Sequence, residues 1–197
     1  MPADFVIPKN NESDFVDIAA RLGINKIYFL YESDHYDEEK IQRKIQLIEN
    51  KKVITGIGLI ANAKNLNKSY KKSNLTVAKS SDDDRILIES KKIKMIYGFE
   101  ESGRKDYIHQ RASGLNHIMC ELASKNNVTV GFSYNSLFGK NNLILGRMKQ
   151  NIKLCQKYKV KTAIGAFTSN PFELRSPYDI SSLFRILGIN IPKNKSF

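Results

Sequence analysis

Short apolar runs alternate with amphipathic segments along the whole chain of 197 residues. The apolar runs have the length of buried strands, and several of the segments between them repeat apolar residues at i, i+3, i+4 and i+7, which form one face of a helix. Alternating strands and helices favour a parallel sheet covered by helices. The expected strands are residues 5–7, 27–31, 53–60, 75–78, 94–97, 107–108, 128–132 and 162–164.

About eight such units follow one another without a change in composition. This repetition predicts an α/β fold, a closed TIM-like (β/α)8 barrel that forms one domain over residues 1–197. A doubly wound open sheet is the alternative. In a barrel the loops that follow the strands form one rim, where functional side chains collect. That rim would hold Arg175, the lysine-rich segment 61–74 and the charged connector 98–112.

The last strand–loop–helix unit has the clearest helix signals. Ser176 fits the N-cap, Pro177 the first helical position and Gly188 the residue that ends the helix. Arg175 directly precedes the cap, so we expect its guanidinium near the helix N-terminus, where backbone N–H groups favour anions. The alternative is a surface arginine that pairs with Glu173 or with solvent.

The charge balance indicates a polyanionic partner. The chain has 32 Lys and Arg against 20 Asp and Glu, a formal net charge of +12. Proteins this basic usually meet nucleic acid, although such charge can also serve solubility alone. A membrane partner is not expected, because no apolar run approaches the roughly 20 residues that span a bilayer.

Cysteine usage and the N-terminal segment indicate a reducing compartment. Cys120 and Cys155 each lie in a helical pattern, and neither has a C-x-x-C neighbour. Such cysteines are typical of small core residues. The first ten residues do not have the pattern of a signal peptide. A cytoplasmic location is therefore expected.

A long helix is predicted from Lys140 to Lys159. Its apolar arc contains Ile144, Met148, Ile152 and Cys155. Arg147 falls inside this arc, and a buried arginine requires a carboxylate or an anion as partner. A stripe of lysines, Lys149, Lys153 and Lys157, lies on the opposite side. This stripe is either a solvated face or a track for a phosphate backbone.

A second helix start follows the charged connector. Ser113 is predicted to cap a helix whose apolar face begins at Leu115, and Arg111 would precede that helix as Arg175 precedes the last one. His117 points away from the apolar face and is expected to be exposed. Two basic residues at two helix starts on one rim would form a phosphate-binding surface.

No catalytic residue, metal ligand or cofactor is predicted from the motifs. The three histidines, His35, His109 and His117, form neither H-x-H nor H-E-x-x-H. No Gly-rich phosphate loop occurs, and no nucleophile pairs with an obvious histidine. The run Asp82-Asp83-Asp84 could indicate a cation site but is more typical of helix capping. The sequence thus favours anion binding over self-sufficient catalysis.

Two segments resemble one known family. The run GRKDYIHQRASGLNHIMCELASKNNVTVGFS resembles the central segment of the archaeal ribonuclease P protein component 3 family, the thirty-kilodalton subunit family shared with eukaryotes. The run FELRSPYDISSLFRILGI resembles its C-terminal signature, and ADFVIP with ARLG fits its opening. One departure is Ile164-Gly165-Ala166, where the family commonly has S-G-A.

The resemblance implies a barrel related to the PHP phosphoesterases but without their metal centre. It implies a subunit of ribonuclease P, the endoribonuclease that removes 5′ leaders from precursor tRNA, in which the RNA performs the cleavage. The implied partners are the ribonuclease P RNA, protein component 2 and other protein subunits, with precursor tRNA met only indirectly. Two alternatives are a divergent metal-dependent phosphoesterase on the same barrel and an adaptor that touches only proteins.

The resemblance also implies a set of basic residues that contact RNA. Its motif positions are Arg104, Lys105, Arg111, His117 and Arg175. We add Arg147 from the helical-wheel argument alone. Contacts to phosphates would position the RNA without reading its sequence, and folded RNA is recognised largely by shape and backbone. The expected site is therefore a charged surface and not a deep pocket.

Overall fold

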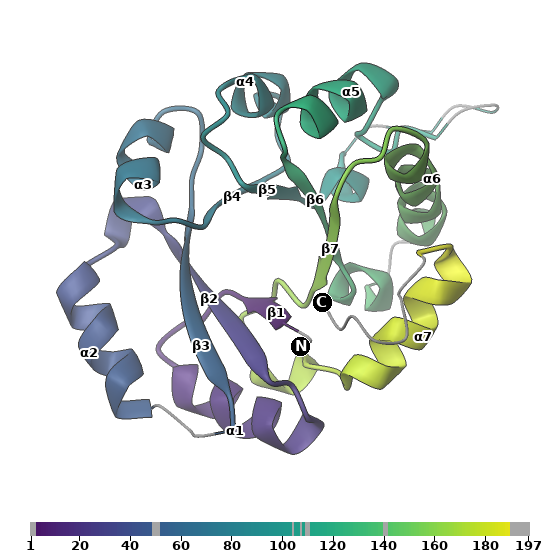
Figure 1. The fold of residues 1–197 in the computed structure, drawn as a ribbon. Coiled ribbons are helices and arrows are strands. Elements are labelled where there is room, and N and C mark those ends of the chain that lie inside the picture. Colours follow the sequence, from purple (N-terminus) through teal and green to yellow (C-terminus); the bar gives the residue numbers. More distant parts are fainter. Residues whose placement is uncertain are drawn as a thin grey trace.

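Seven parallel strands form a barrel in a computed structural model that describes residues 3–48, 52–103, 105–106, 108, 111–139 and 142–189 (Figure 1). The strands are β1 (Ala3–Val6), β2 (Lys26–Glu32), β3 (Ile54–Ile60), β4 (Thr76–Lys79), β5 (Met95–Tyr97), β6 (Thr129–Ser133) and β7 (Thr162–Gly165). The helices outside them are α1 (Glu12–Leu22), α2 (Glu38–Ile48), α3 (Leu66–Lys72), α4 (Asp84–Glu89), α5 (His117–Lys125), α6 (Leu143–Lys157) and α7 (Pro177–Leu187).

The strand order decides between the two predicted architectures. Neighbouring strands follow the chain order from β1 to β7, whereas a doubly wound sheet would reverse direction at a switch point. The ends of β1 and β7 are joined by backbone hydrogen bonds, from Phe167 N to Phe5 O at 2.7 Å and from Ile7 N to Thr168 O at 2.8 Å. The barrel prediction is confirmed, and the open-sheet alternative is wrong.

The predicted number of strands needs correction from eight to seven within the described residues. The eighth strand was expected at residues 107–108. Ile108 lies in a bend outside any strand and is 96% exposed, and Tyr107 is outside the described residues. The connector between β5 and α5 instead runs outside the barrel, where side chains of α6 hold it.

Aromatic rings pack inside the barrel. Phe167 has a positive φ of 48°, which is unusual for a bulky residue. Its ring stacks on Tyr97 with centroids 4.1 Å apart and on Phe5 at 5.6 Å. A Cβ on Gly165 would come within 2.9 Å of the Phe5 ring, so this glycine permits the close packing. As in other barrels, the interior is a packed core and not a pore.

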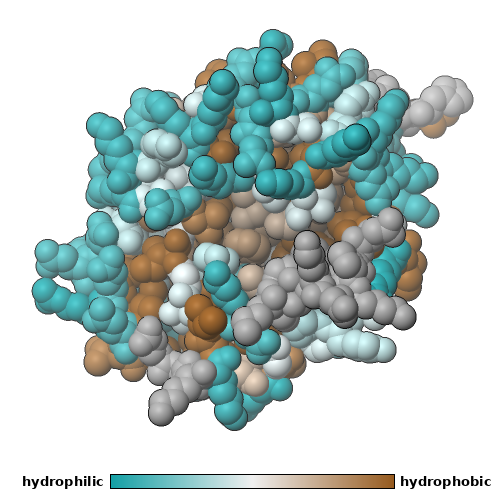
Figure 2. Space-filling model, viewed as in Figure 1, coloured by the Kyte–Doolittle hydropathy of each residue, from teal (hydrophilic) through white to brown (hydrophobic). Residues whose placement is uncertain are grey.

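The view along the barrel axis shows how hydropathy is arranged on one face. Apolar atoms are visible near the centre of this face, and hydrophilic residues cover most of the surrounding helices (Figure 2). Figure 1 shows that these helices ring the strands. Among the described residues, no helix has both the length and the apolar character needed to cross a membrane.

The predicted helix start agrees with the structure for α7 and differs from it for α5. Ser176 caps α7 through a hydrogen bond from Tyr178 N, Pro177 is its first residue and Gly188 ends it, as predicted. The predicted cap at Ser113 is wrong. Asn116 caps α5 and accepts from Met119 N at 2.9 Å, while Ser113 is buried against α6.

Two further boundaries differ from those expected. The lysine-rich segment 61–74, for which no helix is predicted, contains the helix α3. The long helix α6 begins at Leu143 and ends at Lys157, so it is shorter than predicted at both ends. The α6 difference lies at the ends of a periodic segment, where helix boundaries are least certain, whereas α3 lies in a polar segment that has no apolar period.

Asp4 fastens the first strand of the barrel to the last two. Its carboxylate accepts hydrogen bonds from Ala166 N at 2.6 Å, Phe5 N at 2.7 Å and the Tyr134 hydroxyl at 2.7 Å. These bonds link β1 to the segments that follow β7 and β6. Burial raises the pKa of Asp4 from its ordinary value of 3.8 to about 6, although the three hydrogen bonds oppose that shift.

This raised pKa predicts a pH dependence of stability. Between about pH 4 and pH 6 the folded chain keeps a proton on Asp4 that the unfolded chain releases, so the free energy of unfolding should fall as the pH rises through this range. A shift of about 2 units corresponds to about 3 kcal/mol. Asp4→Asn should remove this part of the pH dependence in chemical denaturation. The exposed Asp17→Asn is the control, and equal pH profiles for wild type and Asp4→Asn would contradict the assignment.

Candidate nucleic-acid interface

The predicted basic residues belong to neighbouring connections at the carboxyl end of the barrel. Lys105, Arg111 and His117 lie between β5 and the first turn of α5, and Arg175 lies between β7 and α7. Because β5, β6 and β7 are adjacent in the sheet, the connections after them share one side of the rim. Arg104 lies outside the described residues.

Arg147 of α6 anchors the connector that follows β5. Its Nη1 donates to the carbonyl oxygens of Ser102 at 2.7 Å and Glu100 at 3.3 Å. Its Nε and Nη2 lie 2.9 Å and 2.8 Å from Oδ1 of Asp106. The hydrogen bond from Arg147 holds the pKa of Asp106 below its usual range. Of the two predicted partners, a carboxylate or an anion, the structure supplies the carboxylate.

The expectation that Arg147 itself contacts RNA needs correction. The side chain is only 2% exposed, and its guanidinium is directed at backbone and carboxylate oxygens of the connector. A buried guanidinium with these partners is not presented to a phosphate on the surface. The prediction that it lies on the buried side of the helix is confirmed.

Hydrogen bonds within the connector extend this anchoring to Arg111. Asp106 Oδ1 also accepts from Ala112 N at 2.8 Å, and the Ser102 hydroxyl donates to Ala112 O at 2.8 Å. The two sides of the connector are thus tied together directly beside Arg111. Sequence reading missed Asp106, because nothing in its local pattern marks it as the partner of a residue 41 positions away.

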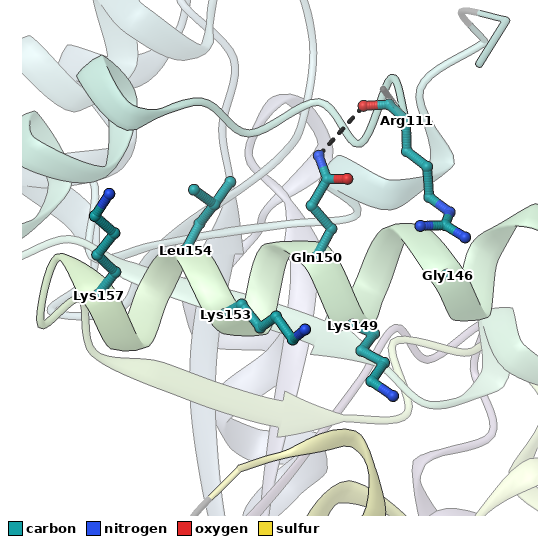
Figure 3. Close-up of a pocket in the computed structure, with 7 residues that line it drawn as sticks. All are labelled: Arg111, Gly146, Lys149, Gln150, Lys153, Leu154 and Lys157. Atoms are coloured by element: carbon teal, nitrogen blue, oxygen red, sulfur yellow. Dashed lines mark hydrogen bonds between the residues drawn. The ribbon is translucent and has the colours of Figure 1, made fainter. Parts of the chain in front are cut away.

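Two amides of α6 hold the end of the connector. Gln150 Nε2 donates to Arg111 O at 3.3 Å and to the Ser113 hydroxyl at 3.0 Å, and Asn151 Nδ2 donates to Ser113 O at 2.8 Å. Figure 3 shows Gln150 reaching from the helix to the Arg111 carbonyl. Asn151 is fully buried and lies four residues after Arg147, so the two side chains are neighbours on the helix. This second polar residue on the buried side of the helix is the one feature of the sequence that could have indicated the contact with the connector.

Arg111 rests against α6 and not at the start of α5. Its exposed side chain reaches toward Gly146, and a Cβ on that glycine would lie 2.6 Å from Arg111 Nε (Figure 3). The helix that follows begins at His117, six residues later. The proposed similarity between Arg111 and Arg175 as residues that directly precede a helix is therefore wrong. His117 is exposed, as predicted, and Lys105 is exposed as well.

Arg175 is exposed and held in one orientation by its own loop. Its Nη1 donates to the carbonyl oxygens of Phe172 at 2.9 Å and Leu174 at 2.8 Å. The guanidinium carbon lies 5.5 Å from the centroid of the Phe138 ring, a cation–π distance. The backbone N–H of Arg175 donates to the Tyr134 hydroxyl at 3.4 Å, and that hydroxyl in turn donates to Asp4.

These contacts bear on the two roles expected for Arg175, an anion contact near the start of α7 and a surface pair with Glu173. The guanidinium donates to carbonyl oxygens of the preceding turn, one residue before the cap of α7 at Ser176. The alternative pairing with Glu173 is not found among the described contacts. Glu173 instead accepts from the Thr168 hydroxyl and from Asn135 Nδ2. The remaining guanidinium N–H groups of Arg175 have no partner in the described part of the chain.

The described residues contain no group of three or more His, Cys, Asp or Glu that could hold a metal ion. His35 lies in a short turn after β2, His117 begins α5, and His109 is outside the described residues. The phosphoesterase alternative therefore finds no ligand set in this part of the chain.

Comparison with known proteins gives consistent matches. The chain is 29% identical to ribonuclease P protein component 3 of Methanocaldococcus jannaschii over 91 residues, which are 44% of this chain and 37% of that protein. It is 27% identical to the protein of that name from Methanococcus maripaludis strain C5 over 159 residues, 75% of this chain and 66% of the relative. These matches span about a third to two thirds of the relatives' lengths.

The fold also matches a solved structure. A chain from a cryo-EM structure of archaeal ribonuclease P with mature tRNA superimposes with a TM-score of 0.75, at 21% identity, over 94% of this chain and 82% of that one. At this identity the likeness concerns the fold. The model of the family described as RNase P subunit p30 matches residues 1–196. The chain belongs to the RNase P subunit p30 family.

Proposed function

We propose that this chain is a protein subunit of ribonuclease P that binds and supports the catalytic RNA, which removes the 5′ leader from precursor tRNA. The observation that carries the proposal is the family match over residues 1–196. The net charge of +12 and the exposed cations of the β5 and β7 connections support it. The RNA performs the cleavage, and the chain acts together with protein component 2 and other protein subunits.

Four exposed side chains are the proposed phosphate contacts: Lys105, Arg111, His117 and Arg175. Arg104 belongs to the same motif and to the same proposal. Arg175 is suited to this role because two carbonyls and one ring fix part of its guanidinium, while the other donors stay available for a phosphate. Contacts of this kind fix the register of an RNA without selecting its sequence.

Arg147 acts as a positioning residue in this proposal. It holds the connector through Ser102 and Asp106, and the connector in turn carries Lys105 and Arg111. The proposal includes a cytoplasmic location, where precursor tRNA is processed under reducing conditions. The free cysteines are consistent with such a compartment.

Reconstitution tests the proposal directly. The chain, component 2 and a cognate RNA subunit are mixed at modest magnesium concentration with precursor tRNA, and 5′ leader removal is followed with and without the chain. We expect cleavage to depend on the chain. Cleavage that proceeds equally well without it would contradict the role of an RNA-supporting subunit.

Arg175→Ala should weaken RNA binding and reduce the dependence of log K on log salt by about one unit, as expected for one lost phosphate contact. Affinity is measured over a salt series in the assembled complex. Arg21→Ala, which removes an exposed charge at the C-terminal end of α1, is the matched control and should leave the salt dependence unchanged. An unchanged slope for Arg175→Ala would argue against the contact.

Arg147→Ala should lower the free energy of unfolding by about 2 to 3 kcal/mol, because buried carbonyls of the connector lose their donor. The amide of Ala112, which donates to Asp106, should exchange its hydrogen faster. Arg147→Lys should rescue only part of the effect, since lysine cannot form the forked contact. A reduced salt slope without faster exchange at Ala112 would instead identify Arg147 as a direct phosphate contact.

A further inference from the structure

A row of cations follows the outer face of α6. Lys149, Lys153 and Lys157 are exposed, and they line a groove of about 510 Å³ with Arg111 at one end. Figure 3 shows Lys149 and Lys153 projecting from one side of the helix, with Arg111 placed across it at Gly146. The groove therefore joins a proposed RNA contact of the rim to the side of the barrel.

The groove contains four cations and no carboxylate among the residues that line it. Elsewhere several basic side chains are paired with Glu, as in Lys79–Glu101 at 2.9 Å and Arg85–Glu89 at 2.9 Å. The three lysines of α6 have no such ion pair within the described residues. Like charges at i and i+4 repel one another along a helix, and a bound polyanion would relieve this repulsion.

The spacing of the lysines favours a linear polyanion. Four residues of helix rise about 6 Å, so Lys149, Lys153 and Lys157 extend over about 12 Å. The interval resembles the separation between successive phosphates along a strand. The groove lining has no aromatic side chain and one half-buried leucine, Leu154, whereas protein partners usually need apolar or aromatic anchors.

We infer that the outer face of α6, together with Arg111, is a second RNA-binding surface, along which the phosphate backbone of one RNA strand runs from the rim down the side of the barrel. The inference rests on the proposed function, because it assigns a further contact to the same RNA. It adds Lys149, Lys153 and Lys157 to the residues that hold the RNA.

Gly146 gives this surface its geometry. A glycine inside a helix lowers stability relative to alanine, yet a Cβ here would lie 2.6 Å from Nε and 3.1 Å from Cζ of Arg111. The glycine allows the guanidinium to lie close to the helix at the start of the lysine row. Gly146→Ala should therefore displace Arg111 while keeping its charge and favouring the helix.

The test compares two triple variants in the complex of the chain with component 2 and the cognate ribonuclease P RNA. Lys149→Gln, Lys153→Gln and Lys157→Gln together remove the row, and glutamine keeps a high helix propensity. Lys94→Gln, Lys125→Gln and Lys161→Gln remove the same charge from exposed positions that do not line the groove. Equal thermal unfolding midpoints for the two variants establish that both fold.

The α6 variant should bind RNA at least about tenfold more weakly at moderate salt, with a salt slope reduced by about 2 to 3 units. The control variant should change the slope by less than about one unit. Gly146→Ala should weaken RNA binding without lowering the unfolding midpoint. Wild-type affinity and slope in the α6 variant would overturn the inference.

Arg175→Ala separates this failure from failure of the proposed function. If Arg175→Ala reduces the slope and the α6 variant does not, the α6 surface is not an RNA contact but the subunit role stands. If the wild-type complex shows no salt-dependent RNA affinity, the proposed function itself fails. If the α6 variant no longer binds component 2 but its RNA affinity keeps the wild-type salt dependence, the lysine row binds an acidic protein surface and the inference is wrong.

Discussion

The buried carboxylate of Asp4 is the contact on which barrel closure depends. A barrel of parallel strands is stable only if its first and last strands do not remain as open edges. Here one side chain accepts three hydrogen bonds from β1, from the end of β7 and from Tyr134 after β6. Three donors offset much of the cost of removing a carboxylate from water. Tyr134 also accepts from the backbone of Arg175, so the joint that closes the barrel supports the loop before α7.

The helix α6 has three faces with different tasks. Ile144, Met148, Ile152 and Cys155 pack into the core. Two buried polar residues beside this apolar arc, Arg147 and Asn151, bind the connector after β5 together with Gln150. The lysines occupy the outside. Because one rigid element carries all three, the connector and the cationic row keep a fixed distance from the barrel and from each other.

The fold was largely predictable because most of its elements have strong apolar periodicity. Seven of the eight expected strands correspond to strands of the barrel, and α7 has the expected cap, first residue and end. The strand predicted at residues 107–108 is wrong because two apolar residues are too few to show the alternation that distinguishes a strand from a surface loop. Ser113 failed as a cap because Gln150 and Asn151, far away in the sequence, bind it instead.

The candidate site was predictable only in part. A helical wheel places Arg147 inside, but its carboxylate partner depends on how a distant connector folds over α6. The orientation of Arg175 depends in the same way on Phe138, which is contributed by the connection after β6. The charge of each basic residue is evident from the local sequence. The contacts of Arg111 with Gly146 and of Arg175 with Phe138 arise only when distant segments pack together, so the local sequence does not predict them.

The stack of Phe5, Phe167 and Tyr97 has a consequence for how such a chain can diversify. Because these rings occupy the interior among the described strands, recognition falls to the side chains on the outer surface and to their charge. Exposed positions usually tolerate substitution at little energetic cost. Recognition can therefore be retuned one surface side chain at a time while the scaffold beneath stays the same.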